Sequence, residues 1–207
     1  MADLPATPTR MPVWAPNPGV PPVARGLAYV FGALLALTVS LSIIIERPPD
    51  LPVVPARWVM YTAPDGLMLQ YPAGWRVRTE AQGQSRTILF TQLPNSPVMV
   101  QALMITLSHD IDAAARAFIV KEVENSLRKD YPNYTPTAVE GDLHRFTCTA
   151  RDSNPLRLAG GWTLQIHGHR VVVLLALTPA PGWSTMEPIL AVMQKNLTFS
   201  SNPHIQP

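Results

Sequence analysis

The sequence predicts an α+β domain, an antiparallel β-sheet flanked by helices, behind one N-terminal transmembrane helix. Three observations support this fold class. The range 26–45 contains no charged residue, which is typical of a membrane span. Apolar side chains then alternate every two residues in two separate groups, as in strands, and each group is followed by a helical repeat of apolar side chains. This order indicates an α/β/α sandwich with one helix on each side of the sheet.

Composition limits the classes of protein to which the chain can belong. The 207 residues are 47% hydrophobic and 14% charged, too apolar for a disordered chain and too charged for several membrane spans. A net charge of +2, with Lys and Arg scattered along the chain, argues against nucleic acid as a partner. The single cysteine, Cys148, allows neither an intramolecular disulfide nor a zinc site built from cysteines.

A Pro-rich N-terminal tail covers residues 1–25. Its composition cannot bury a core and favours extended, polyproline-like conformations. The tail is therefore interpreted as a disordered cytoplasmic extension, with a strip that lies along a partner protein as the alternative.

The range 26–45 is predicted to be the transmembrane helix. With about 1.5 Å of rise per residue, a helix of this length spans about 30 Å, the thickness of a bilayer hydrocarbon core. The run ends in Ile45 and Glu46 and lacks a small-residue cleavage site, so an uncleaved signal-anchor is favoured over a signal peptide. Arg10 and Arg25 give a mild positive bias to the N-terminal side, which predicts a cytoplasmic N-terminus and an extracytoplasmic domain at the inner or plasma membrane.

Small side chains recur every four residues within this helix, at Ala28, Gly32, Ala36 and Ser40. Such a face lets a neighbouring helix approach closely. These four residues are therefore the candidate membrane-helix interface, with chance composition as the alternative. The expected partners are other membrane protein subunits and the lipid bilayer.

The remaining chain is divided into a Pro-rich linker at 46–57, a globular domain at 58–200 and a C-terminal tail at 201–207. The prolines of the linker are expected to form a semi-rigid spacer that holds the domain away from the bilayer.

Short strands are predicted at the start of the domain. Two-residue alternation places apolar side chains on one face of each: Leu67, Leu69 and Tyr71, then Trp75 and Val77, then Ile88 and Phe90. Pro72, Ala73 and Gly74 are expected to form the turn between the first two strands. The range 98–107 is apolar on both faces, which predicts a central strand.

A long helix is predicted at about 110–131, with Ser108 or Asp110 as its cap and Pro132 after its end. Its apolar face comprises Ile111, Ala115, Ile119, Val123 and Leu127, with Phe118 added.

A second strand group follows the long helix. Phe146, Cys148 and Ala150 alternate with polar residues in one strand, and Trp162, Leu164 and Ile166 do so in the next. Gly160 and Gly161 suggest a bulge, and Gly168 with His169 predicts a tight hairpin into a strand at 170–177.

The closing helix is predicted at about 185–196. Ser184 and Glu187 fit a capping box, and Pro188 is expected in the first turn, where its missing N–H is harmless. The apolar face comprises Met186, Ile189, Leu190, Met193 and Leu197.

The segment 67–77, with Tyr71-Pro72 followed by Trp75, resembles the opening of the PsbP-like and DcrB-like domains. The range 170–199, a strand, an amphipathic helix and a short apolar strand, is similar to their ending. The resemblance covers roughly 58–200. It implies a noncatalytic sandwich of the Mog/PsbP type that docks on a membrane complex, or an envelope protein of unassigned role, and it transfers no metal or docking residue.

Catalytic patterns in the sequence are weak. His167 and His169 flank a hairpin glycine and are interpreted as exposed turn residues rather than metal ligands. His144 and Cys148 share one face of a strand, which could suggest a thiol nucleophile with a histidine base. Positions four residues apart in a strand are about 13 Å from each other, which is too far for a hydrogen bond, so Cys148 is assigned to the core. No catalytic residue, cofactor or metal is therefore assigned, and the protein is not expected to be an enzyme.

The expected function is that of a non-enzymatic, single-pass accessory or assembly subunit of a larger membrane complex, photosynthetic or respiratory. The alternative is a membrane-tethered envelope domain that binds a small ligand or metal.

Overall fold

The computed structural model describes residues 50–94, 96–150 and 156–200. The predicted N-terminal tail, the transmembrane helix with Ala28, Gly32, Ala36 and Ser40, the first residues of the linker and the C-terminal tail lie outside the described residues. Within the described part of the chain, no helix is long and apolar enough to cross a membrane.

The described chain forms ten strands, two α-helices and one 3-10 turn. The strands are β1 (Trp58–Thr62), β2 (Leu67–Pro72), β3 (Arg76–Gln82), β4 (Ser85–Thr91), β5 (Met99–Thr106), β6 (Thr135–Glu140), β7 (Leu143–Thr149), β8 (Arg157–His167), β9 (Arg170–Pro179) and β10 (Thr198–Phe199). The helices are α2 (Ala113–Asp130) and α3 (Trp183–Lys195), and the 3-10 turn η2 (Ala180–Gly182) leads into α3.

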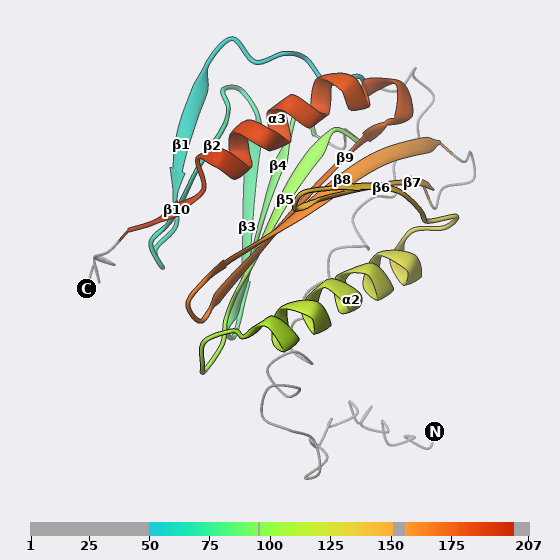
Figure 1. Ribbon diagram of the computed structural model, residues 1–207. Helices are drawn as coiled ribbons and strands as arrows, with labels where there is room; N and C mark the ends of the chain where they lie inside the picture. Colours follow the sequence, from blue (N-terminus) through green and yellow to red (C-terminus); the bar gives the residue numbers. More distant parts are fainter. Residues whose placement is uncertain (1–49, 95, 151–155, 201–207) are drawn as a thin grey trace, which may run out of the picture.

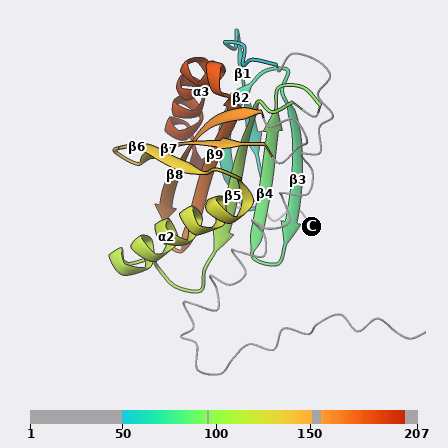
Figure 2. The same ribbon diagram turned by 90° about the vertical axis from the view of Figure 1, so that its right-hand side faces the viewer.

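These elements form three layers. The central layer is a seven-stranded antiparallel sheet with the order β3-β4-β5-β9-β8-β7-β6. Helix α2 covers one face of this sheet, while α3 lies across the other (Figure 1). A second, three-stranded sheet with the order β1-β2-β10 lies beside α3 on the same face. The view turned by 90° shows β3 at one side of the large sheet, away from α3 (Figure 2). The expected α+β class, with an antiparallel sheet and a helix on each side, is confirmed.

The core under α2 is built from alternate residues of four strands. Ile119, Val123 and Leu127 of α2 are almost completely buried against side chains of β5, β7, β8 and β9. Cys148 lies in this core, as the sequence predicted. β5 lies between β4 and β9 and buries both faces, which confirms the predicted central strand.

The core on the opposite face joins the small sheet, α3 and the large sheet. The Tyr-Pro-x-x-Trp motif contributes directly, because Tyr71 packs on Phe90 of β4 with ring centroids 5.1 Å apart and Trp75 is buried. The apolar face predicted for α3 is confirmed, since Met186, Ile189, Leu190, Met193 and Leu197 are all buried in this core.

The start of α2 differs from the sequence-based expectation. The helix begins at Ala113 and its cap is Asp112, whose Oδ1 accepts a hydrogen bond of 2.7 Å from the backbone N–H of Ala115. Ser108 and Asp110 are too far from the first turn to provide this bond, which a cap makes to the second or third helical residue. Phe118 is 42% exposed, because it lies about 100° around the helix from the buried Ile119.

The start of α3 was also predicted wrongly. Turn η2 leads straight into the helix at Trp183, with Gly182 at the cap position and no side-chain cap bond. Ser184 and Glu187 therefore lie inside the helix and form no capping box, and Pro188 lies beyond the first turn. Glu187 instead forms an ion pair with Arg145 of β7.

The turn predicted at Pro72, Ala73 and Gly74 is confirmed between β2 and β3, although β2 belongs to the small sheet and β3 to the large one. Two other expectations for the strands are corrected. Strand β6 was missed because all six of its residues are exposed and show no apolar alternation. Gly160 and Gly161 form no bulge and pair regularly with Phe146 and Arg145; their missing side chains leave room for the rings of Phe146 and Trp183.

Candidate functional site

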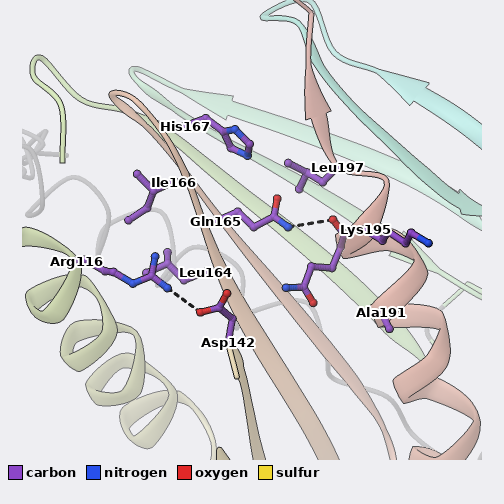
Figure 3. Close-up of a pocket in the computed structure, with 10 residues that line it drawn as sticks. Arg116, Asp142, Leu164, Gln165, Ile166, His167, Ala191, Lys195 and Leu197 are labelled. Atoms are coloured by element: carbon purple, nitrogen blue, oxygen red, sulfur yellow. Dashed lines mark hydrogen bonds and ion pairs between the residues drawn. The ribbon is translucent and has the colours of Figure 1, made fainter. Parts of the chain in front are cut away.

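A depression of about 590 Å³ lies where β8 extends beyond its neighbour β7. The two strands pair only as far as His144 and Trp162, whereas β8 continues to His167 with β9 as its one partner. In the part of the chain that the structure describes, no strand pairs with residues 163–167 on this side. Thr163 and Leu164 are buried there, so the accessible part of the edge is residues 165–167. The depression is open to solvent and is lined by Arg116, Asp142, Leu164, Gln165, Ile166, His167, Ala191, Gln194, Lys195 and Leu197 (Figure 3).

The first wall of the depression comes from the start of α2 and the β6–β7 turn. Arg116 donates a hydrogen bond of 2.8 Å to Asp142, and this ion pair crosses from the helix to the turn (Figure 3). Both side chains are about half exposed, so the pair contributes little to stability and its groups stay accessible to a ligand.

The second wall is the last turn of α3. The side-chain amide of Gln165 donates a hydrogen bond of 3.0 Å to the backbone carbonyl of Gln194, which also accepts one of 3.2 Å from the N–H of Leu197. Lys195 follows at the same helix end, where its positive charge complements the helix dipole. The depression thus presents a guanidinium, a carboxylate, two amides and an ammonium group around an apolar strip of β8.

His144 is the last residue of β7 that pairs with β8, and its side chain lies on the face covered by α2. Its ring stacks on Trp162, with centroids 4.0 Å apart and 14° between the planes, and its Nδ1 is 3.7 Å from a carboxylate oxygen of Glu124. Burial lowers the pKa of His144, and the nearby Glu124 carboxylate only partly opposes this effect. His144 is therefore neutral near pH 7. Its Nδ1 makes no hydrogen bond to another described residue.

Two more titratable side chains, those of Tyr134 and Cys148, belong to the core under α2. Burial raises the pKa of the Tyr134 hydroxyl, and it raises the pKa of the Cys148 thiol to about 12. Cys148 is therefore a protonated core residue at neutral pH, unsuited to nucleophilic attack.

On the opposite face of β7, Arg145 bridges two carboxylates. It pairs with Glu187 of α3 and, at 2.7 Å, with Glu140 of β6. The hydrogen bond to Glu187 is the main cause that raises the pKa of Arg145, and Glu140 adds to it. This arrangement joins α3 to the sheet edge and has a structural role.

The predicted site residues are distributed as follows. Ala28, Gly32, Ala36 and Ser40 lie outside the described residues. His167 lies at the border of the depression, and its ring packs edge to face with that of Phe199, with centroids 4.9 Å apart. His169 occupies the hairpin turn, where its backbone carbonyl accepts a hydrogen bond from Leu107. Among the described residues, no three His, Cys, Asp or Glu side chains gather as metal ligands.

The depression itself was missed from the sequence. Arg116 and Asp142 are 26 positions apart, and Gln165 and Gln194 are 29 positions apart. No spacing motif links such pairs. The feature that could have indicated the depression is the unequal length of two neighbouring strands, because β8 has 11 residues and β7 has seven.

The chain was compared with known proteins. No family model matches the sequence, and no curated protein matches it. Solved structures with a similar backbone include a protein from Bacteroides thetaiotaomicron, with 10% identity and a TM-score of 0.44, over 72% of this chain and 50% of that one. The chain thus spans about half the length of that structure.

Two further solved structures are similar in fold. Cyanobacterial PsbP (CyanoP) from Synechocystis has 11% identity and a TM-score of 0.45, over 75% of this chain and 99% of that one. LpqN, involved in cell envelope biogenesis of Mycobacterium tuberculosis, has 19% identity and a TM-score of 0.43, over 70% of this chain and 91% of that one. A PsbP structure is therefore among the solved structures with a similar backbone. Likenesses at this level concern the fold alone.

Proposed function

We propose that this protein is a non-enzymatic accessory subunit of a larger membrane complex, anchored by the helix predicted at 26–45, with its domain outside the cytoplasmic membrane. The observation that carries the proposal is the open edge of β8 at residues 165–167, which are half-buried or exposed. A strand edge of this kind can pair with an extended segment of another protein through backbone hydrogen bonds.

The surroundings of the open edge favour a protein segment as its occupant. An added strand would run between the Arg116–Asp142 pair and the last turn of α3, where charged and amide groups can bind its polar side chains. Each backbone hydrogen bond contributes about 0.5–1.5 kcal/mol net, so several bonds along this edge provide a specific but modest affinity. A second attachment through the anchor raises the effective concentration of the partner at this edge.

The test uses the full chain, extracted in mild detergent, with co-purifying subunits identified by mass spectrometry. The variant Ile166→Lys places a charge beside the open edge, and Val139→Lys places the same charge on β6, the outer strand of the same sheet. We expect co-purification to be lost with Ile166→Lys and kept with Val139→Lys. A wild-type protein that purifies alone as a monomer contradicts the proposal.

The anchor is tested separately. If Ala28, Gly32, Ala36 and Ser40 face a partner helix, Gly32→Leu blocks the close approach and weakens assembly while membrane insertion is kept. Loss of insertion, or unchanged assembly, shows that the segment is a plain tether.

A second function is favoured by the size of the depression, since cavities of about 300–1,000 Å³ hold small ligands. In this case the domain is a membrane-tethered binding module for a polar ligand that contacts Gln165 and the Arg116–Asp142 pair. A thermal-shift screen of the full chain against metals, lipids and small metabolites tests it. A hit that disappears in Gln165→Ala supports ligand binding, and a screen without hits contradicts it.

A further inference from the structure

The segment that precedes β1 is fixed on the domain. The side-chain amide of Gln92, next to the end of β4, donates a hydrogen bond of 3.0 Å to the carbonyl of Leu51 and accepts one of 2.9 Å from the N–H of Val53. Pro52, between them, is buried and packs on Gly182, where a Cβ atom would collide with its ring. The chain is therefore attached to the domain from Leu51 onward.

Exposure within this segment repeats every three residues. Pro52 is buried and Pro55 is half-buried, while Leu51, Val53 and Val54 are 49%, 64% and 74% exposed. Three residues per turn is the period of a polyproline II helix, so the prolines face the domain and the aliphatic side chains face outward.

Leu93 follows Gln92 and is 47% exposed. Together, Leu51, Val53, Val54 and Leu93 form a surface of exposed aliphatic side chains that we name the apolar rim. It holds four of the eight large hydrophobic side chains that are exposed among the described residues. Such clustering differs from singly scattered apolar residues, which need no explanation, and it marks a contact surface.

We propose that the apolar rim rests on the lipid surface of the membrane in which this protein is anchored. The inference rests on the proposed anchor at 26–45. Leu51 follows the last residue of that range by six positions, and an extended chain covers at most about 3.5 Å per residue, or about 20 Å. The rim therefore lies within about 20 Å of the hydrocarbon boundary, and about 6 Å of this distance is headgroup layer.

The chemistry of the rim fits lipid better than water. Its aliphatic side chains gain transfer free energy in the interfacial layer, in proportion to the apolar area that leaves water. Because the linker is attached to the domain from Leu51, the short free chain keeps the rim near the bilayer and lowers the entropy lost on contact.

The test measures the depth of nitroxide labels on the full chain, purified alone and reconstituted in phospholipid nanodiscs. Labels are placed by Val53→Cys and by Val139→Cys, two positions that are equally exposed at 64%. Cys148 stays in place, since its thiol is buried. A third label, Ala36→Cys, reports on the anchor. Collisions with oxygen and with a water-soluble nickel chelate give the depth of each label.

We expect the ratio of oxygen to nickel collisions to be several-fold higher at position 53 than at position 139. Adding Leu93→Asp to the Val53→Cys protein should bring this ratio down toward that at position 139. Equal ratios at 53 and 139, while position 36 reports bilayer depth, overturn the lipid contact and leave the anchor intact. A water-exposed label at position 36 overturns the anchor and the proposed function. Protection of position 53 only after a co-purified subunit is added shows that a protein covers the rim, which also overturns the proposal.

Discussion

Gly160→Ala tests the packing of β8 against both of its neighbours. A Cβ at this position would lie 2.5 Å from Cζ of Phe146 and 2.8 Å from the backbone oxygen of Ala176 on β9. The ring of Phe146 is almost fully buried, and the carbonyl is fixed by the sheet, so neither can withdraw without moving its strand. Overpacking of this kind costs about 1–3 kcal/mol.

Two effects modify this value. Alanine reduces the conformational freedom of the unfolded chain, which offsets about 0.5–1 kcal/mol of the cost. The obstruction by backbone keeps the cost near the upper end of its range, so we expect a net loss of about 2 kcal/mol, or roughly 4–8 °C in Tm for a domain of this size.

The matched control for this change is Gly161→Ala. A Cβ there would also meet neighbours, 2.6 Å from the ring edge of Trp183 and 3.0 Å from a methyl group of Leu143. Both contacts are side-chain ends, and both side chains are only partly buried, so they can rotate. Thermal unfolding of the full chain in mild detergent, followed by near-UV circular dichroism, compares the variants. Equal Tm values for the two variants would refute the argument from the fixed backbone oxygen.

Three further predictions follow from the charged and buried groups. The folded-state pKa of His144 lies below its unfolded value, so the unfolded chain binds more protons as the pH falls below about 6.5, and the protein loses stability there. His144→Phe should flatten this part of the curve of Tm against pH. An unchanged slope would show that other groups cause the loss. The thiol of Cys148, with a pKa of about 12, should react with a thiol reagent at neutral pH only after unfolding; fast labelling of the folded protein contradicts its burial. Glu187→Gln removes one charged partner of Arg145 and should lower the Tm. The difference in Tm between wild type and variant should become smaller in high salt, because salt screens the ion pair. A difference in Tm that does not depend on salt would indicate a packing effect instead.

The repetitive parts of the fold could be predicted from the sequence because their signals are local. The buried residues Leu67 and Leu69 of β2, and the face of α3 around Met186, follow directly from alternation and helical spacing. The first residues of the helices were harder to predict. At the start of α2, three carboxylate or hydroxyl side chains compete as caps, and only the backbone path selects Asp112.

Features that depend on distant partners could not be predicted. The division into two sheets is decided by the pairing of β2 with β1 and β10, strands that lie at opposite ends of the domain sequence. All residues of β6 are exposed, and the strand is held by backbone hydrogen bonds to β7. Such bonds do not require alternating apolar side chains, so the sequence shows no strand pattern there. The depression was missed for the same reason, since the side chains around it come from both helices, the β6–β7 turn and β8.

The apolar rim and the open edge of β8 lie toward opposite ends of the large sheet, and this arrangement restricts the kind of partner. β8 begins at Arg157, beside the end of β9, and η2 connects that end to Gly182, which contacts Pro52 in the rim segment. The open residues 165–167 lie eight to ten positions further along the strand, or about 26–33 Å at a rise of about 3.3 Å per residue. If the apolar rim lies on the lipid surface and β8 runs perpendicular to the membrane plane, a partner must therefore reach about 26–33 Å above the membrane to pair with this edge. A short loop between two membrane helices does not extend so far, whereas a folded extracytoplasmic domain or a terminal extension does. Subunits that co-purify through the open edge should therefore carry such a domain or extension, and capture of small integral subunits alone argues for contact through the membrane helix.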